Sequence, residues 1–388
     1  MSILHTYQAS QLIKHCHVLT HTSSCRSSPI AAVFARHKYV NSHHFELTFF
    51  EYHRVTVCKR EEYKIIHAPH TPPAQINVPQ SHLPHPKLKE TQYIMAETHH
   101  FNASSLFDLS DTVAVITGGG TGIGLMGAQA LAANGAKVYI IGRRVEALEK
   151  ASKSHDPKNG GAIIPLGPCD VTKKDDLDRI VKELQEKEKY INLLCCNAGV
   201  GGPKAEPDID DASKLKEKLW ENESVEEWNE TYNTDVTSVY FTTVAFLPLL
   251  QAAIKPNGPL ERFGASVITT SSMSGMMRHA QGHFAYNAAK AATIHLTKLM
   301  SAEFQRTWIR VNSIAPGYFP SEMTVKESDD RQKSELPVEK VQEKGHVPAM
   351  RGGKEEEMGM AFLFLAKNGY VNGQILAVDG GVLNVVGS

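Results

Sequence analysis

Short apolar runs alternate with longer helical stretches from about residue 106 to the C-terminus. The runs are almost wholly apolar, which is typical of strands that are buried on both faces of a parallel sheet. The predicted strands span residues 112–116, 137–141, 162–166, 190–196, 265–270, 309–314 and 374–378. Because helices are expected between them, we predict an α/β fold in residues 106–388, a single-domain, Rossmann-type, doubly wound parallel sheet.

Residues 1–94 lack any persistent period. They hold twelve of the nineteen histidines, and residues 71–89 have the proline-rich, polar composition of a linker. We interpret this region as a disordered or non-native extension, since Met95 has the character of an ordinary start. The alternative is a mitochondrial or other transit peptide, because the first 45 residues lack Asp and Glu. No spacing of His and Cys matches a zinc site, so no metal is expected.

Two further polar stretches interrupt the pattern. Residues 201–229 are acidic, and we expect a solvated surface excursion there. Residues 318–347 show no clear period, and we expect a mobile lid over the substrate. His279 and His283 lie, by their position in the sequence, beside the expected substrate pocket. We interpret them as loop histidines without a role.

Composition narrows the function further. The chain has 41% hydrophobic and 21% charged residues, and its net charge of −1 gives no footprint for nucleic acid or for an anionic membrane. No apolar run approaches the length of a membrane span. The six cysteines form no disulfide framework, which favours a reducing, cytoplasmic compartment. Composition therefore indicates neither nucleic acid nor a membrane as a partner.

A glycine-rich loop links the first strand to a helix that runs through Ala133. Residues 117–124 have the sequence Thr-Gly-Gly-Gly-Thr-Gly-Ile-Gly. Glycines allow a close backbone approach, and the helix N-terminus then faces a pyrophosphate, so the segment predicts a dinucleotide site. The candidate cofactor-binding residues in it are Gly118, Thr121, Gly122, Ile123 and Gly124.

The ends of the next strands indicate which cofactor binds. Arg143 and Arg144 follow the second strand, where an acidic residue would bind the ribose 2′-hydroxyl of NAD(H). Two guanidinium groups favour the 2′-phosphate of NADP(H), although the arginines could instead simply begin a solvated helix. Asp170, after the third strand, could accept a hydrogen bond from adenine or cap the next helix.

A third group of residues suggests chemistry. Tyr286 and Lys290 are four residues apart in a predicted helix, so they share a face. A phenol transfers a proton near neutral pH only if something stabilises its phenolate, and a nearby ammonium does so. Serines at the end of the fifth strand could hydrogen-bond the same substrate oxygen. After the fourth strand, the small segment Asn197-Ala198-Gly199 suits contact with a cofactor, and the Asn197 amide can brace neighbouring strands.

Together these motifs resemble the short-chain dehydrogenase/reductase family, over about residue 106 to the C-terminus, and in particular its 3-oxoacyl and fungal secondary-metabolism reductases. The resemblance implies that Tyr286 is the general acid or base, that Lys290 lowers the pKa of Tyr286 and holds the nicotinamide ribose, and that Pro316-Gly317 form the turn beside the nicotinamide. It also implies a homodimer or homotetramer that packs through the alanine-rich helix after Tyr286.

Three positions depart from the family pattern. Cys196 stands where the family has the first Asn of Asn-Asn-Ala-Gly. Ser272 has the usual spacing to Gly275, whereas Ser274 has the usual spacing to the tyrosine; we favour Ser272, since a loop accepts an extra residue more readily than a strand end shifts. Asp235 replaces the Asn that helps to hold a water in the proton relay. An ionised carboxylate cannot donate a hydrogen bond. Its charge favours a protonated Lys290 and opposes ionisation of Tyr286, so we expect reduced or altered activity.

The sequence therefore predicts an NADP(H)-dependent oxidoreductase that interconverts a ketone and a secondary alcohol. A non-catalytic NADP(H)-binding regulator or scaffold of the same fold is the alternative, and an NAD(H)-dependent enzyme is a third possibility. The sequence does not identify the substrate or the direction of the reaction in the cell.

Overall fold

The computed structural model describes residues 98–157, 160–254 and 264–387, and seven strands in them form one parallel sheet in the order β3-β2-β1-β4-β5-β6-β7. The strands are β1 (Val113–Thr117), β2 (Lys137–Ile141), β3 (Ala162–Leu166), β4 (Leu193–Cys196), β5 (Ala265–Thr270), β6 (Ile309–Pro316) and β7 (Ile375–Val378). The prediction of a Rossmann-type, doubly wound parallel sheet is confirmed. The predicted extension, residues 1–94, lies outside the described residues.

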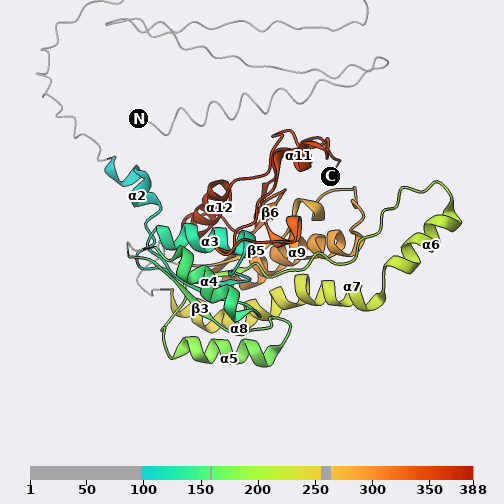
Figure 1. Cartoon of the computed structure of the whole chain (residues 1–388). Helices are drawn as coiled ribbons and strands as arrows, with labels where there is room; N and C mark the ends of the chain where they lie inside the picture. Colours follow the sequence, from blue (N-terminus) through green and yellow to red (C-terminus); the bar gives the residue numbers. More distant parts are fainter. Residues whose placement is uncertain (1–97, 158–159, 255–263, 388) are drawn as a thin grey trace, which may run out of the picture. The chain divides into compact units, whose positions relative to one another are not determined.

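The central strands are apolar because helices cover both of their faces. Every residue of β1, β4, β5 and β6 is buried. One core layer packs under α3 (Gly122–Ala133), α4 (Val145–His155) and α12 (Glu355–Lys367). The other packs under α5 (Lys174–Gln185), α8 (Ser238–Ala252) and α9 (Phe284–Glu303). Figure 1 shows α3 and α12 on one side of the strands and α5 and α8 on the other.

Strand β4 begins three residues later than the predicted strand, at Leu193. The side chain of Asn192 accepts a hydrogen bond from the backbone N–H of Val113 at 2.9 Å, and the backbone N–H of Asn192 donates to the carbonyl of Val113 at 2.8 Å. Residue 192 therefore already contacts β1, but the regular ladder starts only beyond it.

The acidic excursion after β4 contains two helices, α6 (Ala212–Asn222) and α7 (Val225–Tyr232). Asp211 caps α6 by accepting a hydrogen bond from the N–H of Lys214 at 2.9 Å, and Ser224 and Glu227 form a capping box on α7. Helix α6 buries none of its residues and projects from the body in Figure 1. This agrees with the expected solvated surface excursion. The extent of α6 was not predicted, because a helix without a buried face leaves no hydrophobic period in the sequence.

Between α7 and α8 the chain forms a π-helical turn, η3 (Asn233–Thr237), which carries Asp235. The expected lid, residues 318–347, contains two short helices, α10 (Glu322–Val325) and α11 (Val338–Gln342). The remaining short elements are η2 (His99–Phe101), α2 (Ala103–Leu106), η4 (Met273–Gly275), η5 (Phe304–Thr307) and η6 (Val382–Asn384).

Strand β6 carries a buried cation that caps a helix. Arg310 is 2% exposed and donates to the carbonyls of Leu365 (3.1 Å) and Ala366 (3.1 Å) in the last turn of α12 and of Val371 (3.0 Å) in the loop that follows. Burial lowers the pKa of its guanidinium to about 10. The last carbonyls of α12 are thus satisfied inside the protein, as a helix C-terminus requires.

None of the helices in the described part of the chain combines the length and the apolarity that a membrane crossing requires.

Candidate active site

A cleft of about 1540 Å³ runs along the carboxyl ends of the strands. Its lining includes the glycine loop, the turns after β2, β3, β4 and β5, the start of α9, and the segment between β6 and α12. In an open α/β sheet, ligands bind at this edge, where the order of the strands reverses. All of the candidate site residues except the buried Gly124 and Asp235 line this cleft.

The glycine loop is tightly packed at one end of the cleft. Gly118 has φ +63°, and a Cβ on it would lie 3.1 Å from the Cα of Ala198. A Cβ on Gly124 would lie 2.3 Å from the carbonyl oxygen of Gly118. Thr121 is the N-cap residue of α3 but makes no side-chain cap, so the first N–H groups of α3 can bind an anion.

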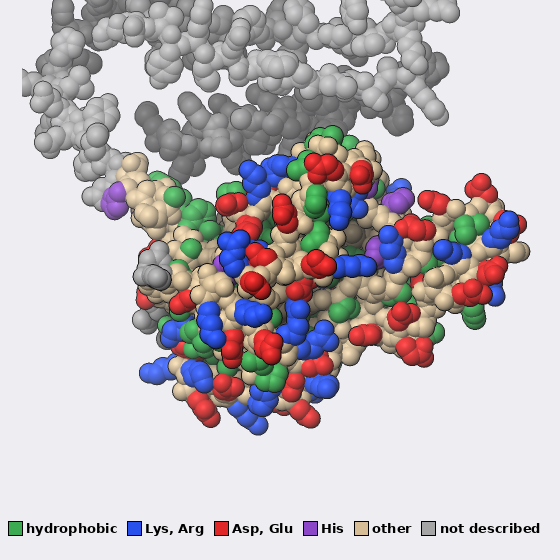
Figure 2. Space-filling model, in the orientation of Figure 1, with side chains coloured by type: hydrophobic (Ala, Val, Ile, Leu, Met, Phe, Trp, Pro, Cys, Tyr) green, Lys and Arg blue, Asp and Glu red, His purple; other side chains and the backbone are tan. Residues whose placement is uncertain are grey.

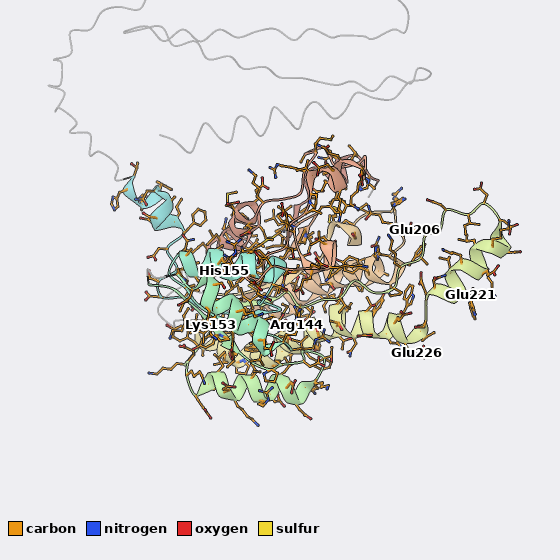
Figure 3. The ribbon with its side chains drawn as sticks, in the orientation of Figure 1. Arg144, Lys153, His155, Glu206, Glu221 and Glu226 are labelled. Carbon is orange, nitrogen blue, oxygen red and sulfur yellow. The ribbon has the colours of Figure 1, made fainter. Side chains whose placement is uncertain are left out.

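The two arginines after β2 have different surroundings. Arg144 forms a two-pronged ion pair with Glu322 of α10, with Nη2–Oε2 at 2.7 Å and Nη1–Oε1 at 3.3 Å. Arg143 forms no ion pair with any described residue and is exposed at the cleft. Figure 3 labels Arg144 at the start of α4. Of the pair, Arg143 is therefore the one whose guanidinium is available to a ligand.

Asp170 does not cap α5, so that expectation was wrong. The N-cap residue of α5 is Lys173, and the Asp170 carboxylate accepts hydrogen bonds from the N–H and hydroxyl of Thr172, at 3.1 and 2.7 Å. Burial raises the pKa of Asp170, but these hydrogen bonds and the charges of Lys173 and Arg143 bring it below its ordinary value. The carboxylate is ionised and faces the cleft.

Asn197 joins three neighbouring strands, as its position predicted. Its amide group donates to the carbonyls of Thr117 (3.3 Å) and Gly118 (3.4 Å), and its Oδ1 accepts from the hydroxyl of Thr270 (3.1 Å). The side chain thereby links the carboxyl ends of β1, β4 and β5. These bonds hold the glycine loop against the turn that contains Ala198.

Cys196, which stands where the family has an asparagine, carries a buried and unreactive thiol. Its Sγ lies 3.7 Å from the hydroxyl of Thr243 inside the protein, and burial raises its pKa to about 12. The neighbouring Cys195 is also buried, and burial raises its pKa as well. Neither thiol has the thiolate character that nucleophilic chemistry requires.

Helix α9 brings Tyr286 and Lys290 together at the centre of the cleft. The Lys290 ammonium lies 5.5 Å from the centroid of the Tyr286 ring and donates to the carbonyl of Thr270 at 3.2 Å. The side chain of Ser272 acts on the phenol of Tyr286 and lowers its pKa. Ser274 contributes its backbone N–H, which donates to the Ser272 oxygen at 3.1 Å. This geometry supports the choice of Ser272 over Ser274.

Asp235 forms a buried ion pair behind Lys290. Its Oδ2 lies 3.3 Å from the Lys290 ammonium, and its Oδ1 accepts from the N–H of Val200 at 2.8 Å. A Cβ on Gly199 would lie 2.9 Å from the same Oδ1 and 3.2 Å from the ammonium, so the turn after β4 rests directly on the pair. The expected effect of the Asp235 charge on Lys290 thus acts through a direct ion pair.

The pair shifts the ionisation of the whole centre. Burial raises the pKa of Asp235 despite the Lys290 charge. Burial alone would lower the pKa of Lys290, but the charges of Asp235 and Tyr286 raise it above its ordinary value. For Tyr286, burial and the Asp235 charge outweigh the opposing effects of Lys290 and Ser272, so its pKa is also raised. These directions agree with the effect expected of a carboxylate at residue 235.

Pro316 ends β6, and Gly317 packs closely against the residue after β7. The N–H of Gly317 donates to the carbonyl of Val378 at 2.8 Å, and a Cβ on Gly317 would lie 2.6 Å from the Cα of Asp379. Both Pro316 and Gly317 line the cleft beside the tyrosine.

The far wall of the cleft comes from the segments after Arg278 and after Gly317, which the sequence placed at the substrate pocket, but the contacts between them were not predicted. The side-chain amide of Gln281 donates to the hydroxyl of Tyr318 at 2.8 Å, and that hydroxyl lies 3.0 Å from Nε2 of His346. Gln281 has φ +52° and precedes Gly282, with φ +75°. Glycine at residue 282 permits the tight turn that these two angles describe. His279 and His283, expected to have no role, also line the cleft, and the His283 ring lies 6.5 Å from that of Tyr286.

No group of three His, Cys, Asp or Glu side chains in the described ranges is arranged to hold a metal ion.

Comparisons with known proteins agree with this geometry. The profile of the short chain dehydrogenase family matches residues 112–332. The short-chain dehydrogenase/reductase PhomF of Diaporthe leptostromiformis is 40% identical over 294 residues, covering 74% of this chain and 96% of that protein. The 3-oxoacyl-[acyl-carrier-protein] reductase FabG of Chlamydia muridarum is 34% identical over 277 residues, covering 71% and 98%.

Two solved structures match the fold with a TM-score of 0.58. The Pseudomonas aeruginosa RhlG/NADP active-site complex is 28% identical, and the match covers 71% of this chain and 98% of that one. A 7α-hydroxysteroid dehydrogenase complexed with NADH and 7-oxo glycochenodeoxycholic acid is 26% identical, with 72% and 97% covered.

Proposed function

The chain belongs to the short-chain dehydrogenase/reductase family of oxidoreductases, and we propose that it uses NADP(H) to interconvert a ketone and a secondary alcohol. The observation that carries the proposal is the meeting of Ser272, Tyr286 and Lys290 in a cleft that begins at a glycine loop. These groups supply a hydrogen-bond donor, a proton and a cation beside a site for a nicotinamide cofactor.

In the proposed reduction, Ser272 donates a hydrogen bond to the substrate carbonyl oxygen and polarises it. The bound cofactor supplies the hydride to the carbonyl carbon. Tyr286 gives its phenolic proton to the oxygen, so that the alcohol leaves neutral and a phenolate remains beside Lys290. Oxidation uses the same groups in reverse. Asp235 holds Lys290 protonated but disfavours the phenolate, so activity is expected to be reduced, not lost.

The choice of NADP(H) rests on Arg143. One matching structure holds NADP and another holds NADH, so family membership alone does not select the cofactor. Arg143 is exposed at the cleft, and the preceding residue is Gly142, not an acid. A guanidinium there favours the 2′-phosphate of NADP(H). The proposed roles of the glycine loop, Asn197 to Gly199 and Pro316-Gly317 in binding this cofactor are consistent with their places in the cleft.

The proposed assembly is a homodimer or homotetramer. Helix α9 exposes a face that includes Leu299, which is 50% exposed. The cytoplasm is the proposed compartment, and the buried, unpaired state of Cys169, Cys195 and Cys196 is consistent with it.

The test is the reduction of a panel of ketones and 3-oxoacyl thioesters with NADPH, which is monitored by the loss of NADPH absorbance. Tyr286→Phe is expected to lower kcat by about 10² to 10⁴-fold, since it removes the acid. Tyr370→Phe is the matched control, because that tyrosine is fully exposed outside the cleft. If NADPH binds, no ketone is reduced and Tyr286→Phe changes nothing, the enzyme proposal is wrong and the non-catalytic regulator takes its place.

A further inference from the structure

Three loops form the wall of the cleft that lies beyond the catalytic tyrosine. They are residues 203–206 after β4, residues 279–283 before α9, and residues 344–346 between β6 and α12. The N–H of Ala205 donates to the carbonyl of Gly282 at 2.8 Å, which ties the first loop to the second. We call this the distal wall.

The distal wall carries a cation without a counter-ion. The Lys344 ammonium lies 4.6 Å from the centroid of the Tyr318 ring, and no carboxylate in the described part of the chain forms an ion pair with it. The side chain as a whole is exposed, but the protein atoms around the ammonium and the charge of Lys204 lower its pKa. Both causes mean that the ammonium lacks electrostatic compensation here.

The other charges of the distal wall do not supply that compensation. Glu206 is paired with Lys204 at 2.9 Å. Figure 3 labels Glu206 on the segment that leads out to α6, away from Arg144 and the cofactor end of the cleft. In Figure 2, Lys or Arg and His side chains lie around the hollow between the body and this projecting segment, with Asp and Glu side chains among them.

The unpaired cation is within electrostatic reach of the catalytic centre. Lys344 and Lys204 both lower the pKa of His283, after the larger effect of burial, and the His283 ring lies 6.5 Å from the Tyr286 ring. The Gln281, Tyr318 and His346 side chains form a hydrogen-bonded group beneath Lys344, which fixes the aromatic face on which its ammonium rests.

Building on the proposed function, we infer that the substrate is a ketone that also carries a carboxylate, and that Lys344 binds this carboxylate while Ser272 and Tyr286 hold the carbonyl. An anion placed between Lys344 and Lys204 reduces the repulsion between two ammonium groups and gives Lys344 the counter-ion that the described residues do not supply. A cleft concentrates the electric field of these ammonium groups more than an open surface does. Lys344 is thus a specificity-determining residue.

The test compares 4-acetylbenzoate with its methyl ester, which differ in charge at the far end of the ketone. With NADPH, wild-type protein is expected to show a KM for the carboxylate about 10-fold below that for the ester, since a charge-assisted hydrogen bond has about this effect. Lys344→Met is expected to raise the KM of the carboxylate about 10-fold, with kcat and the KM of the ester nearly unchanged. Lys344→Arg is expected to retain the preference. Lys218→Met, on the exposed α6, is the matched control and is expected to change nothing.

A calorimetric titration of 4-acetylbenzoate in the presence of NADP+ provides a second readout that does not depend on turnover. Equal KM values for ester and carboxylate, unchanged binding in Lys344→Met, or no binding of the carboxylate at all would each overturn this inference. Lys344-dependent binding without reduction of any ketone would support the anion site and would instead overturn the proposed function.

Discussion

The carboxylate of Asp235 lies 3.3 Å from the ammonium of Lys290, and both groups are buried. The pair places a negative charge behind the lysine that assists Tyr286. It therefore works in two directions, because it keeps Lys290 charged and raises the pKa of the phenol. The balance of these effects can be measured by neutralising residue 235.

Asp235→Asn is expected to shift the pH profile of alcohol oxidation toward lower pH. Oxidation needs the Tyr286 phenolate, which forms only as the pH rises through the pKa of the phenol, and removing the negative charge lowers that pKa. A gain of about 3- to 10-fold in rate at neutral pH corresponds to half to one pKa unit. The same change leaves Lys290 as an unpaired buried cation, so the urea midpoint of unfolding is expected to fall. An unchanged profile would contradict this account of the pair.

Ser272→Ala is expected to lower kcat by about 10² to 10³-fold, since it removes the donor that polarises the carbonyl. Ser274→Ala is the matched control, because Ser274 supports Ser272 through its backbone N–H, which alanine retains. Steady-state kinetics on the two variants separates them. The assignment of the serine is wrong if Ser274→Ala shows the larger loss.

Arg143→Ala is expected to weaken NADPH binding by about 10-fold or more and to leave NADH binding nearly unchanged, because only NADPH carries the 2′-phosphate. Arg144→Ala is expected to have a smaller effect, since Glu322 already engages that guanidinium. Fluorescence titration of both cofactors provides the measurement. Glu322→Gln would remove the ion pair of Arg144 and is expected to tighten NADPH binding. Weaker NADPH binding in this variant would contradict the assignment.

Glu357→Gln is expected to reduce stability at neutral pH but not at strongly acid pH. Two hydrogen bonds from Arg351 hold the pKa of Glu357 at about 2, below its ordinary 4.5. A carboxylate with a depressed pKa stabilises the folded state above pH 4.5, and this contribution is lost as the pH falls toward 2. Because the side chains of Arg351 and Glu357 are 39% and 34% exposed, the expected loss of stability is small. Urea unfolding of both proteins at pH 7 and pH 2 checks it, and equal midpoints at pH 7 would refute it.

The strands could be predicted because each is buried on both faces and leaves a continuous apolar run, as residues 113–117 do. Tyr286, Lys290 and the glycine loop could be predicted because their spacing is local. The ion pair of Arg144 with Glu322 could not, since 178 positions separate its members. Lys344 belongs to the same class: its partner Tyr318 and its neighbour Lys204 are brought to it only by the fold.

Asp235 was predicted as a departure in residue type, but not in how the backbone presents it. The turn that carries it, residues 233–237, is π-helical and lies between two α-helices. A π-helical turn holds one residue more than an α-helical turn and bulges from the helix. Nothing in the local sequence distinguishes it from an ordinary turn, because its residue types are compatible with both.

This bulge makes the length of the helical segment as important as its chemistry. Each residue of an α-helix turns the chain by about 100°. Deleting a single residue such as Thr234 would allow α7, this turn and α8 to form one continuous α-helix. Asp235 and α7 would then rotate together about the helix axis, and Asp235 would move away from Lys290. The contact between Asp235 and Lys290 therefore depends on the number of residues in this turn as well as on the identity of residue 235.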